Sequence, residues 1–202
     1  HIHTIYSFSP YSPTKAIWMA YNAGLKTAGI MDHDSISGAR EFIEAGKIIG
    51  MPTTIGVECR ADFSGTPLNG KKINNPDQAT IAYVALHGIP HTKIDEVKSF
   101  FEPYSKQRNI RNSRMVDRIN EVMKPYGISL DFQKDVVPVS KSSEGGSITE
   151  RHISLALSRK LIDKFGKGNE LVNFLKNELK TNLGAIIEKL LLDENNGFYE
   201  YD

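Results

Sequence analysis

The sequence contains little cysteine, no excess of charge of one sign and no long apolar run. Cys59 is the single cysteine, which excludes an intrachain disulfide and any zinc site built on two or more cysteines. Lys and Arg number 25 against 24 Asp and Glu, so a net charge of +1 provides no diffuse basic surface for nucleic acid or an anionic membrane. The longest apolar runs, such as residues 81–86, are far too short to cross a membrane. We therefore expect a cytoplasmic protein that binds neither membrane nor, stably, nucleic acid.

The rest of the composition is that of an ordinary folded protein. Of 202 residues, 40% are hydrophobic and 24% are charged, which is enough for one full-sized core, or for one core plus a small appended piece. The chain opens on His1 without a Met and stops at Asp202, soon after a turn-like Asn-Asn-Gly sequence. We expect it to be a piece of a longer protein.

Helix and strand patterns alternate over the first 60 residues. A Ser-Pro helix start precedes residues 15–22, and residues 36–49 also have helical spacing. Short apolar segments at 27–31 and 53–57 have the pattern of buried strands, and each ends on polar residues. This order predicts a parallel sheet with crossover helices, in which ligands collect at the C-terminal ends of the strands.

The sequence changes character after residue 60. Residues 60–78 are rich in Gly, Pro and Asn and predict a long excursion or lid, after which 81–86 predicts a further buried strand. Helices are then expected at 95–123, with an interruption near Pro103, at 147–165 and at 169–192. Trp18 and Met19, on the first helix, are expected in the core or at an interface.

Two histidines at the start of the chain are candidate metal ligands. In an extended segment, side chains two residues apart point to the same side, so His1 and His3 would present both imidazoles to one ion. The alternative is the remnant of an affinity tag, which a terminal His-Ile-His also resembles.

Polar residues follow the next two predicted strands. Asp32, His33 and Asp34 come after the first of them, and Glu58 ends the second. An imidazole and a carboxylate at adjacent strand ends are donors that a divalent ion requires. A helix N-cap for Asp34 and a surface position for Glu58 are the structural alternatives. The ordered set of His-x-His, Asp-His-Asp and Gly-x-Glu favours the metal interpretation.

These segments resemble the first motifs of the polymerase and histidinol phosphatase (PHP) family. The resemblance is carried by His-Ile-His-Thr at 1–4, Met-Asp-His-Asp-Ser at 31–35 and Ile-Gly-Val-Glu at 55–58. Residues 107–115 look like the Arg-rich helix of the family's phosphoesterase branch, and 151–153 are similar to its Arg-Pro-His helix start.

The resemblance implies an α/β fold, a distorted (β/α)7 TIM-like barrel, which would be incomplete here. Its mouth would hold up to three Mn, Fe, Zn or Mg ions for the hydrolysis of a phosphate ester. On this interpretation residues 1–94 are the N-terminal part of the barrel, 95–192 a mostly helical insertion, and 193–202 a return toward the barrel.

The resemblance also implies roles for individual residues. The metal ligands would be His1, His3, His33 and Glu58, with Glu58 bridging ions and with Asp32 and Asp34 supporting the ligands. The substrate phosphate would bind Arg108, Arg111 or Arg114, because a guanidinium matches the geometry of a phosphate. In the mechanism that we expect, beyond what the resemblance implies, the leaving oxygen would take its proton from His87 or His152.

Two positions depart from the family pattern. Phe8 stands where the family commonly has an Asp or His ligand, and Tyr83 aligns with a ligand histidine, with His87 four residues later. The leading hypothesis is therefore a metal-dependent phosphoesterase that acts on a small phosphorylated substrate. The alternative is a degenerate PHP-like domain that binds or scaffolds without catalysis. A hydrolase of the amidohydrolase type ranks third, because no lysine follows a clear strand end to form its bridging carbamate.

Overall fold

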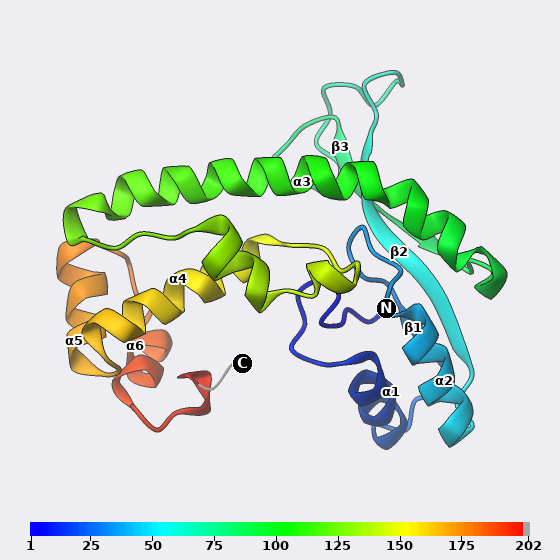
Figure 1. Ribbon diagram of the computed structural model, residues 1–202, viewed down its shortest axis with the longest axis horizontal. Helices are drawn as coiled ribbons and strands as arrows, with labels where there is room; N and C mark the ends of the chain where they lie inside the picture. The colour runs from blue at the N-terminus through cyan, green and yellow to red at the C-terminus, as the bar shows by residue number, and fades with distance from the viewer. Residues whose placement is uncertain (200–202) are drawn as a thin grey trace. The chain divides into compact units, whose positions relative to one another are not determined.

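The computed structural model describes residues 1–199, which divide into two compact units (Figure 1). The first unit comprises residues 1–111 and 140–149, and the second comprises 112–139 and the chain from 150 onward. The fold is mixed α/β, with a three-stranded sheet in the first unit and helices in both. The boundary between the two units falls between residues 111 and 112, within a long helix. That residues 95–192 form an insertion into a barrel stays a prediction.

The first unit contains the sheet and the helices next to it. Its elements are α1 (Pro13–Asn22), β1 (Ala28–Ile30), α2 (Ala39–Ile49), β2 (Thr53–Asp62), β3 (Ile81–His87) and most of α3 (Ile94–Met123). The second unit holds the end of α3 together with α4 (Glu150–Phe165), α5 (Asn169–Asn173) and α6 (Ala185–Leu192). No helix among the described residues is both long enough and apolar enough to cross a membrane.

Local signals explain the first two helices. The hydroxyl of Ser12 caps α1 by accepting a hydrogen bond from the N–H of Lys15 at 3.1 Å, and Pro13 occupies the first helical position. The second helix ends at Gly50, whose φ of 70° lies in the left-handed region that favours glycine. Both helices lie where the sequence predicts them, although α2 begins at Ala39, three residues late.

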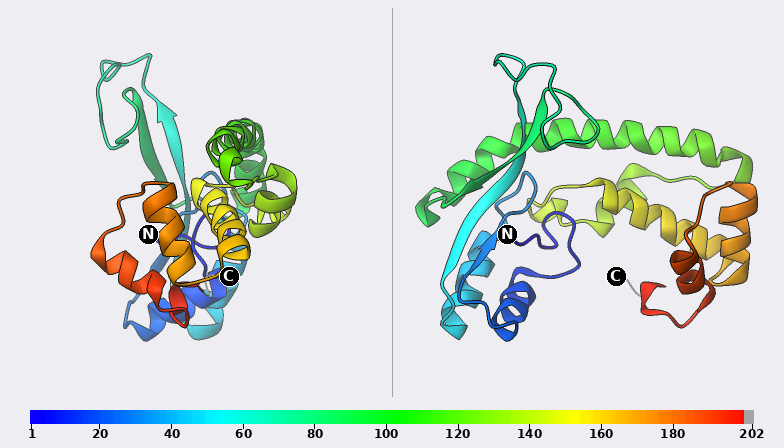
Figure 2. Two further views of the ribbon diagram at one scale, coloured as in Figure 1. Left: turned by 90° about the vertical axis from the view of Figure 1, so that its left-hand side faces the viewer. Right: turned by 180° about the vertical axis from the view of Figure 1, so that it is seen from behind.

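The sheet is parallel in one half and antiparallel in the other. β1 pairs with β2 in parallel, with Ala28 opposite Thr53, and α2 makes the predicted crossover. β3 pairs antiparallel with β2, from His87 opposite Gly56 to Ile81 opposite Asp62. The predicted excursion therefore connects two arms of one hairpin, over residues 63–80 (Figure 2). A parallel arrangement does not extend to β3, and this outer strand is only partly buried.

The core of the first unit lies between the sheet and its helices. Ile17, Phe42 and Val57 are fully buried there. On α1 the residues in this core are Ala16, Ile17 and Ala20, which lie within about one turn of one another. Trp18 is 59% exposed and Met19 39% exposed, so they do not lie in the core, and the expected alternative of an interface stays a prediction.

Two helix predictions need correction. α3 continues through Pro103, which is exposed, while Phe101 on the same turn is buried in the core and holds the turn that Pro103 weakens. The single helix expected at 169–192 is instead α5, a π-helical turn and α6, because the backbone leaves the helical conformation at Lys180 (φ 53°) and is extended at Gly184.

The second unit has its own apolar core. Its buried residues include Met123, Leu161 and Phe174. The ring of Phe174 stacks on that of Phe165, with 4.1 Å between the ring centroids. The hydroxyl of Tyr199 donates to the carbonyl of Leu191, which ties the end of the described chain to α6. The predicted return of 193–202 toward a barrel stays a prediction, and residues 200–202 lie outside the described residues.

Candidate metal centre

The first four residues run alongside β1. The N–H of Ile2 donates to the carbonyl of Gly29 at 2.7 Å, and the carbonyl of Ile2 accepts from the N–H of Met31 at 2.8 Å. Ile2 is thus bridged in parallel to the strand, and its side chain packs against the core. His1 and His3 consequently share the other side of the segment, as their spacing predicts.

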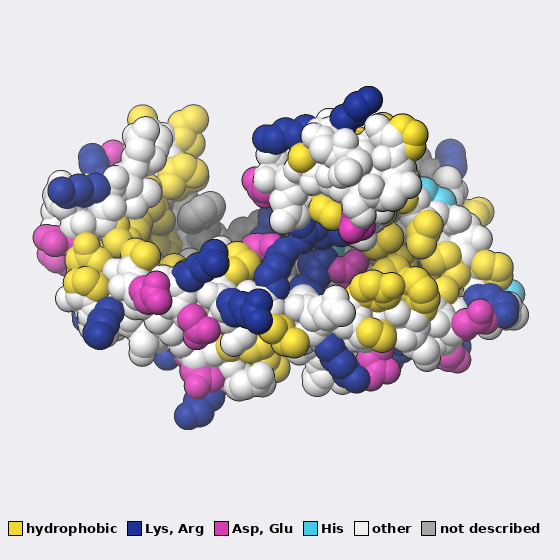
Figure 3. All heavy atoms as spheres, turned by 90° about the horizontal axis from the view of Figure 1, so that it is seen from above, with side chains coloured by type: hydrophobic (Ala, Val, Ile, Leu, Met, Phe, Trp, Pro, Cys, Tyr) yellow, Lys and Arg dark blue, Asp and Glu magenta, His cyan; other side chains and the backbone are white. Residues whose placement is uncertain are grey.

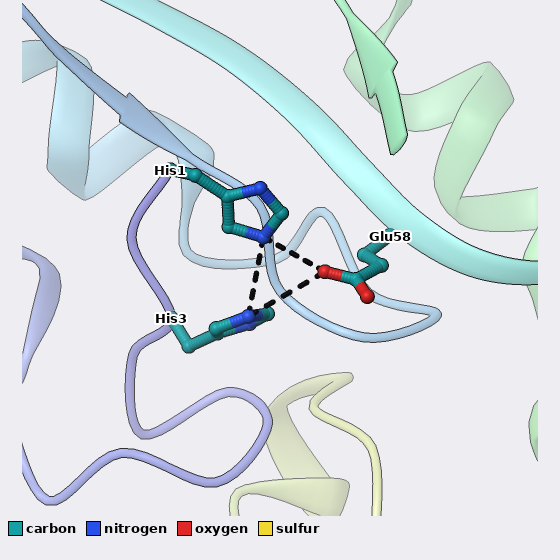
Figure 4. A group of neighbouring side chains, drawn as sticks. All are labelled: His1, His3 and Glu58. Carbon is teal, nitrogen blue, oxygen red and sulfur yellow. Dashed lines mark hydrogen bonds and ion pairs between the residues drawn. The ribbon is translucent and has the colours of Figure 1, made fainter. Parts of the chain in front are cut away.

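Glu58 meets both imidazoles from the neighbouring strand. In β2, Val57 is buried in the core, so Glu58 projects from the opposite face. Its Oε2 atom lies 2.7 Å from Nε2 of His1 and 3.5 Å from Nε2 of His3, and the two nitrogens are 3.2 Å apart (Figure 4). Among the described residues, these three form the group whose donor atoms could hold a metal ion.

The geometry of this group fits a divalent cation. Metal–nitrogen bonds of about 2.0–2.1 Å in a tetrahedral site place neighbouring ligand atoms roughly 3.3 Å apart. The three distances between donor atoms here, 2.7, 3.2 and 3.5 Å, lie on either side of that value. Two imidazole nitrogens and one carboxylate oxygen can therefore converge on one ion without a change of backbone.

A buried carboxylate fixes the chain next to His3. Asp32 accepts hydrogen bonds of 2.6 Å from the N–H and the hydroxyl of Thr4 and from the hydroxyl of Ser7. Burial raises the pKa of Asp32, and the hydrogen bonds from Ser7 and Thr4 oppose that rise. Asp32 thereby holds the turn that follows His3 and fixes the direction from which that imidazole enters the site.

His33 lies beside the group in a stack of rings. Its ring is parallel to that of His3 within 19°, with centroids 4.7 Å apart. The ring of Phe8 lies 4.5 Å from His3 and 5.3 Å from His33, and Tyr83 lies 5.9 Å from His33. Phe8 and Tyr83, which stand where the sequence resemblance implies metal ligands, are therefore both neighbours of His33.

The turn after His33 is tied to Glu58 and to α3. The N–H of Asp34 donates to the carbonyl of Glu58 at 2.9 Å, and the N–H of Glu58 donates to the carbonyl of Asp32 at 3.1 Å. The Asp34 carboxylate forms a salt bridge with the guanidinium of Arg108, and their side chains are only 10% and 12% exposed. The sequence offers no signal for this pair, whose members are 74 residues apart.

A cavity of about 740 Å³ lies next to this turn in the first unit. Its wall contains Asp34, Arg60, Arg108 and Arg111, two of which were predicted phosphate ligands, and α3 adds aromatic side chains. Sequence reasoning missed Arg60, which lies two residues after Glu58 on β2. On one face of the molecule acidic and basic side chains are interspersed, in keeping with the near-neutral net charge (Figure 3).

The other predicted residues lie in different places. His87 ends β3 and is exposed, with its ring 6.2 Å from that of His1. Arg114 is exposed on the part of α3 that belongs to the second unit. His152 is buried in α4 of the second unit, and this burial lowers its pKa to about 4. Cys59 is half-buried, and burial, with the charges of Asp34 and Glu58, raises the pKa of its thiol.

Comparison with known proteins shows similarity of fold. No family model matches the chain. A 5'-3' exoribonuclease of Haemophilus influenzae is 34% identical over 65 residues, which are 32% of this chain and 24% of that protein. A crystal structure from Bifidobacterium adolescentis, assigned to the metal-dependent phosphoesterases, has a TM-score of 0.57 and 24% identity over 87% of this chain and 52% of its own.

A second solved structure has a similar fold. It is an amidohydrolase from Chromobacterium violaceum, solved with bound sulfate and no metal, with a TM-score of 0.53 and 17% identity over 86% of this chain and 52% of its own. The chain spans about half the length of these two solved proteins and about a quarter of the exoribonuclease. At these identities the structural likeness shows the fold alone.

Proposed function

We propose that this chain forms part of a metal-dependent phosphoesterase of the PHP type, in which the sheet of the first unit begins a distorted (β/α)7 barrel. The observation that carries the proposal is the convergence of His1, His3 and Glu58 on one point with distances suited to a cation. A divalent cation held there would lower the pKa of a bound water and neutralise charge on a phosphate. Two imidazoles and one carboxylate suit Zn, Mn or Fe better than Mg, which prefers oxygen ligands.

The chain's own residues supply the remaining parts of the proposed reaction. Arg60 and Arg111 line the cavity that contains Asp34, a residue whose backbone is bonded to Glu58, and their guanidinium groups would bind and orient the phosphate of a small phosphorylated substrate. His87 lies next to His1 and would give a proton to the leaving oxygen. His152, with a pKa of about 4, is neutral at pH 7 and is a poor proton donor, so we assign the proton transfer to His87.

The proposed number of ions follows from the donor groups. His1, His3 and Glu58 account for one cation. A second would use His33, which the resemblance makes a ligand and which here stacks on His3. We therefore propose at least one resident ion, with Glu58 as the carboxylate able to bridge to another.

Hydrolysis of p-nitrophenyl phosphate, with Mn²⁺ or Zn²⁺ supplied, tests the proposal. The chain should release nitrophenol faster than Glu58→Ala, which loses the carboxylate of the centre. Glu44→Ala is the matched control, because Glu44 is an exposed glutamate on α2. Equal rates for the chain and Glu58→Ala would contradict the proposal. Cation binding without hydrolysis of this or other phosphate esters would favour the alternative of a PHP-like binding or scaffolding domain.

A phosphodiesterase acting on RNA is a second candidate. The 34% identity over 65 residues to a protein named a 5'-3' exoribonuclease favours it. The net charge of +1 does not provide a continuous basic groove for a long strand. A short oligoribonucleotide labelled at its 3' end distinguishes the two candidates, since stepwise shortening from the 5' end requires the phosphodiesterase activity.

A further inference from the structure

The turn at residues 32–34 and the ligand Glu58 are mechanically linked. Two backbone hydrogen bonds join them, one from the N–H of Glu58 to the carbonyl of Asp32 and one from the N–H of Asp34 to the carbonyl of Glu58. His33, between these two positions, is bridged in parallel to Glu58. A displacement of the turn therefore displaces the backbone that carries the Glu58 carboxylate.

The turn contains an unfavourable backbone conformation. Asp34 has a φ of 48°, in the left-handed region, which Asp and Asn occupy more readily than other non-glycine residues but still less readily than glycine. Contacts made by the turn with other elements stabilise it in this form. The side chain of Asp34 makes such a contact, its salt bridge to Arg108.

The salt bridge between Asp34 and Arg108 is buried, and burial strengthens the attraction between the two charges. Both side chains are about nine-tenths buried, so solvent screens their attraction only weakly. Loss of one partner would leave the other as an uncompensated buried charge. Without Arg108, the buried Asp34 carboxylate would be favoured in positions that reach water, and any shift of the turn that allows this would also shift Glu58.

We propose that Arg108 is a positioning residue for the metal centre, acting through Asp34 on the turn and on Glu58. This proposal rests on the metal centre described under the proposed function. It gives Arg108 a role different from the phosphate binding that the sequence predicts for it. An arginine that is not itself a metal ligand would then influence the affinity of the centre for a cation.

Cation binding by the whole chain tests this role directly. Isothermal titration with Zn²⁺ or Mn²⁺ should show an affinity lower by about 10–100-fold in Arg108→Met, the usual effect of losing a partner that orients a ligand. Asp34→Asn should show a similar loss, and it keeps a residue type that tolerates a positive φ. The variant that combines Arg108→Met with Asp34→Asn should bind the cation no more weakly than either single variant, because each of the three lacks the salt bridge between residues 34 and 108.

An exposed pair of the same type provides the control. Arg40 and Asp95 form a salt bridge of 2.8 Å in the first unit, with side chains 62% and 83% exposed. Arg40→Met and Asp95→Asn should leave the cation affinity unchanged. Arg108→Lys, which keeps the charge, should recover part of the affinity.

The outcomes separate this proposal from the one on which it rests. If the unaltered chain binds no cation, the metal centre itself is wrong. If it binds and Arg108→Met, or Asp34→Asn where Arg108→Met does not fold, binds the cation equally well, the positioning role is overturned, whether or not thermal stability falls. Weaker binding of inorganic phosphate by Arg108→Met with unchanged cation affinity would overturn it in favour of the phosphate role.

Discussion

Nε2 of His1 and Nε2 of His3 lie 3.2 Å apart, and both face the same carboxylate oxygen of Glu58. The tautomer of each ring determines whether its Nε2 carries a proton or a lone pair. Neutral imidazole is the form that binds metals. The N-terminal segment and β2 thus arrange two nitrogen donors and one oxygen donor around a common point.

Removal of a metal ion from the group of His1, His3 and Glu58 should lower the free energy of unfolding. With a cation at 100 times its dissociation constant, the free energy of unfolding should rise by about 2.7 kcal/mol, and EDTA should reverse the gain. Glu58→Ala should lose most of this response in thermal denaturation with and without Mn²⁺ or Zn²⁺. Glu44→Ala, an exposed glutamate, should keep it. An equal metal-dependent shift in Glu58→Ala would show that the cation binds elsewhere.

Phe8→Asp should increase the metal content. The ring of Phe8 lies against both His3 and His33, so a carboxylate at this position is within reach of a second ion between them. Mass spectrometry of the metal content, with tag-free protein, should give a higher ratio of ions to chain than for the unaltered sequence. Phe8→Ala is the control, since it removes the ring without adding a donor. Identical ratios in all three proteins would count against a role for His33 as a ligand.

Asp32→Asn should destabilise the first unit. Asp32 is buried and accepts three hydrogen bonds from Thr4 and Ser7, and bonds to a charged acceptor contribute more than those to an amide. A loss of about 2–4 kcal/mol in the free energy of unfolding is expected, measured by urea denaturation. Asp95→Asn, at an exposed aspartate, should change it little. Unchanged stability of Asp32→Asn would mean that an amide replaces the carboxylate fully.

The free energy of unfolding should depend on pH because His152 is buried in its neutral form. Its pKa falls from 6.5 to about 4 in the folded chain because burial disfavours the charged form. The unfolded state therefore binds the extra proton first, and the stability that the neutral side chain contributes is complete above pH 6.5 and is lost as the pH falls toward 4. The loss corresponds to about 3 kcal/mol.

Urea midpoints between pH 7 and pH 4.5 measure this slope. His152→Leu should flatten it, whereas His91→Leu, at an exposed histidine, should retain it. The same slope in His152→Leu and in the unaltered chain would assign the acid sensitivity to other groups.

Sequence patterns predict the parts of this molecule that depend on local spacing. The two-residue period places His1 and His3 on one side, and the α, β, α, β order leads to the parallel pairing of β1 and β2. Capping residues mark the ends of α1 and α2 within a few residues. The position of Glu58 beside the histidines follows from the parallel register of neighbouring strands.

Long-range pairing is not contained in such patterns. The direction of β3 depends on how residues 63–80 connect it to β2, and an apolar run alone does not distinguish a parallel from an antiparallel strand. The contact between Asp34 and Arg108 depends on where α3 packs, which no short motif specifies. Helical spacing likewise continues through Lys180, although the backbone there leaves the helix.

β2 changes its partner along its length, and Glu58 lies near the change. Its first residues pair with β1, its later residues pair with β3, and the N–H and carbonyl of Glu58 itself are bonded to the turn at 32–34. The amide proton of Glu58 can exchange with solvent only when the turn releases it. Hydrogen–deuterium exchange at this one amide would therefore report how often the backbone of the candidate ligand separates from the turn. This measurement requires no substrate.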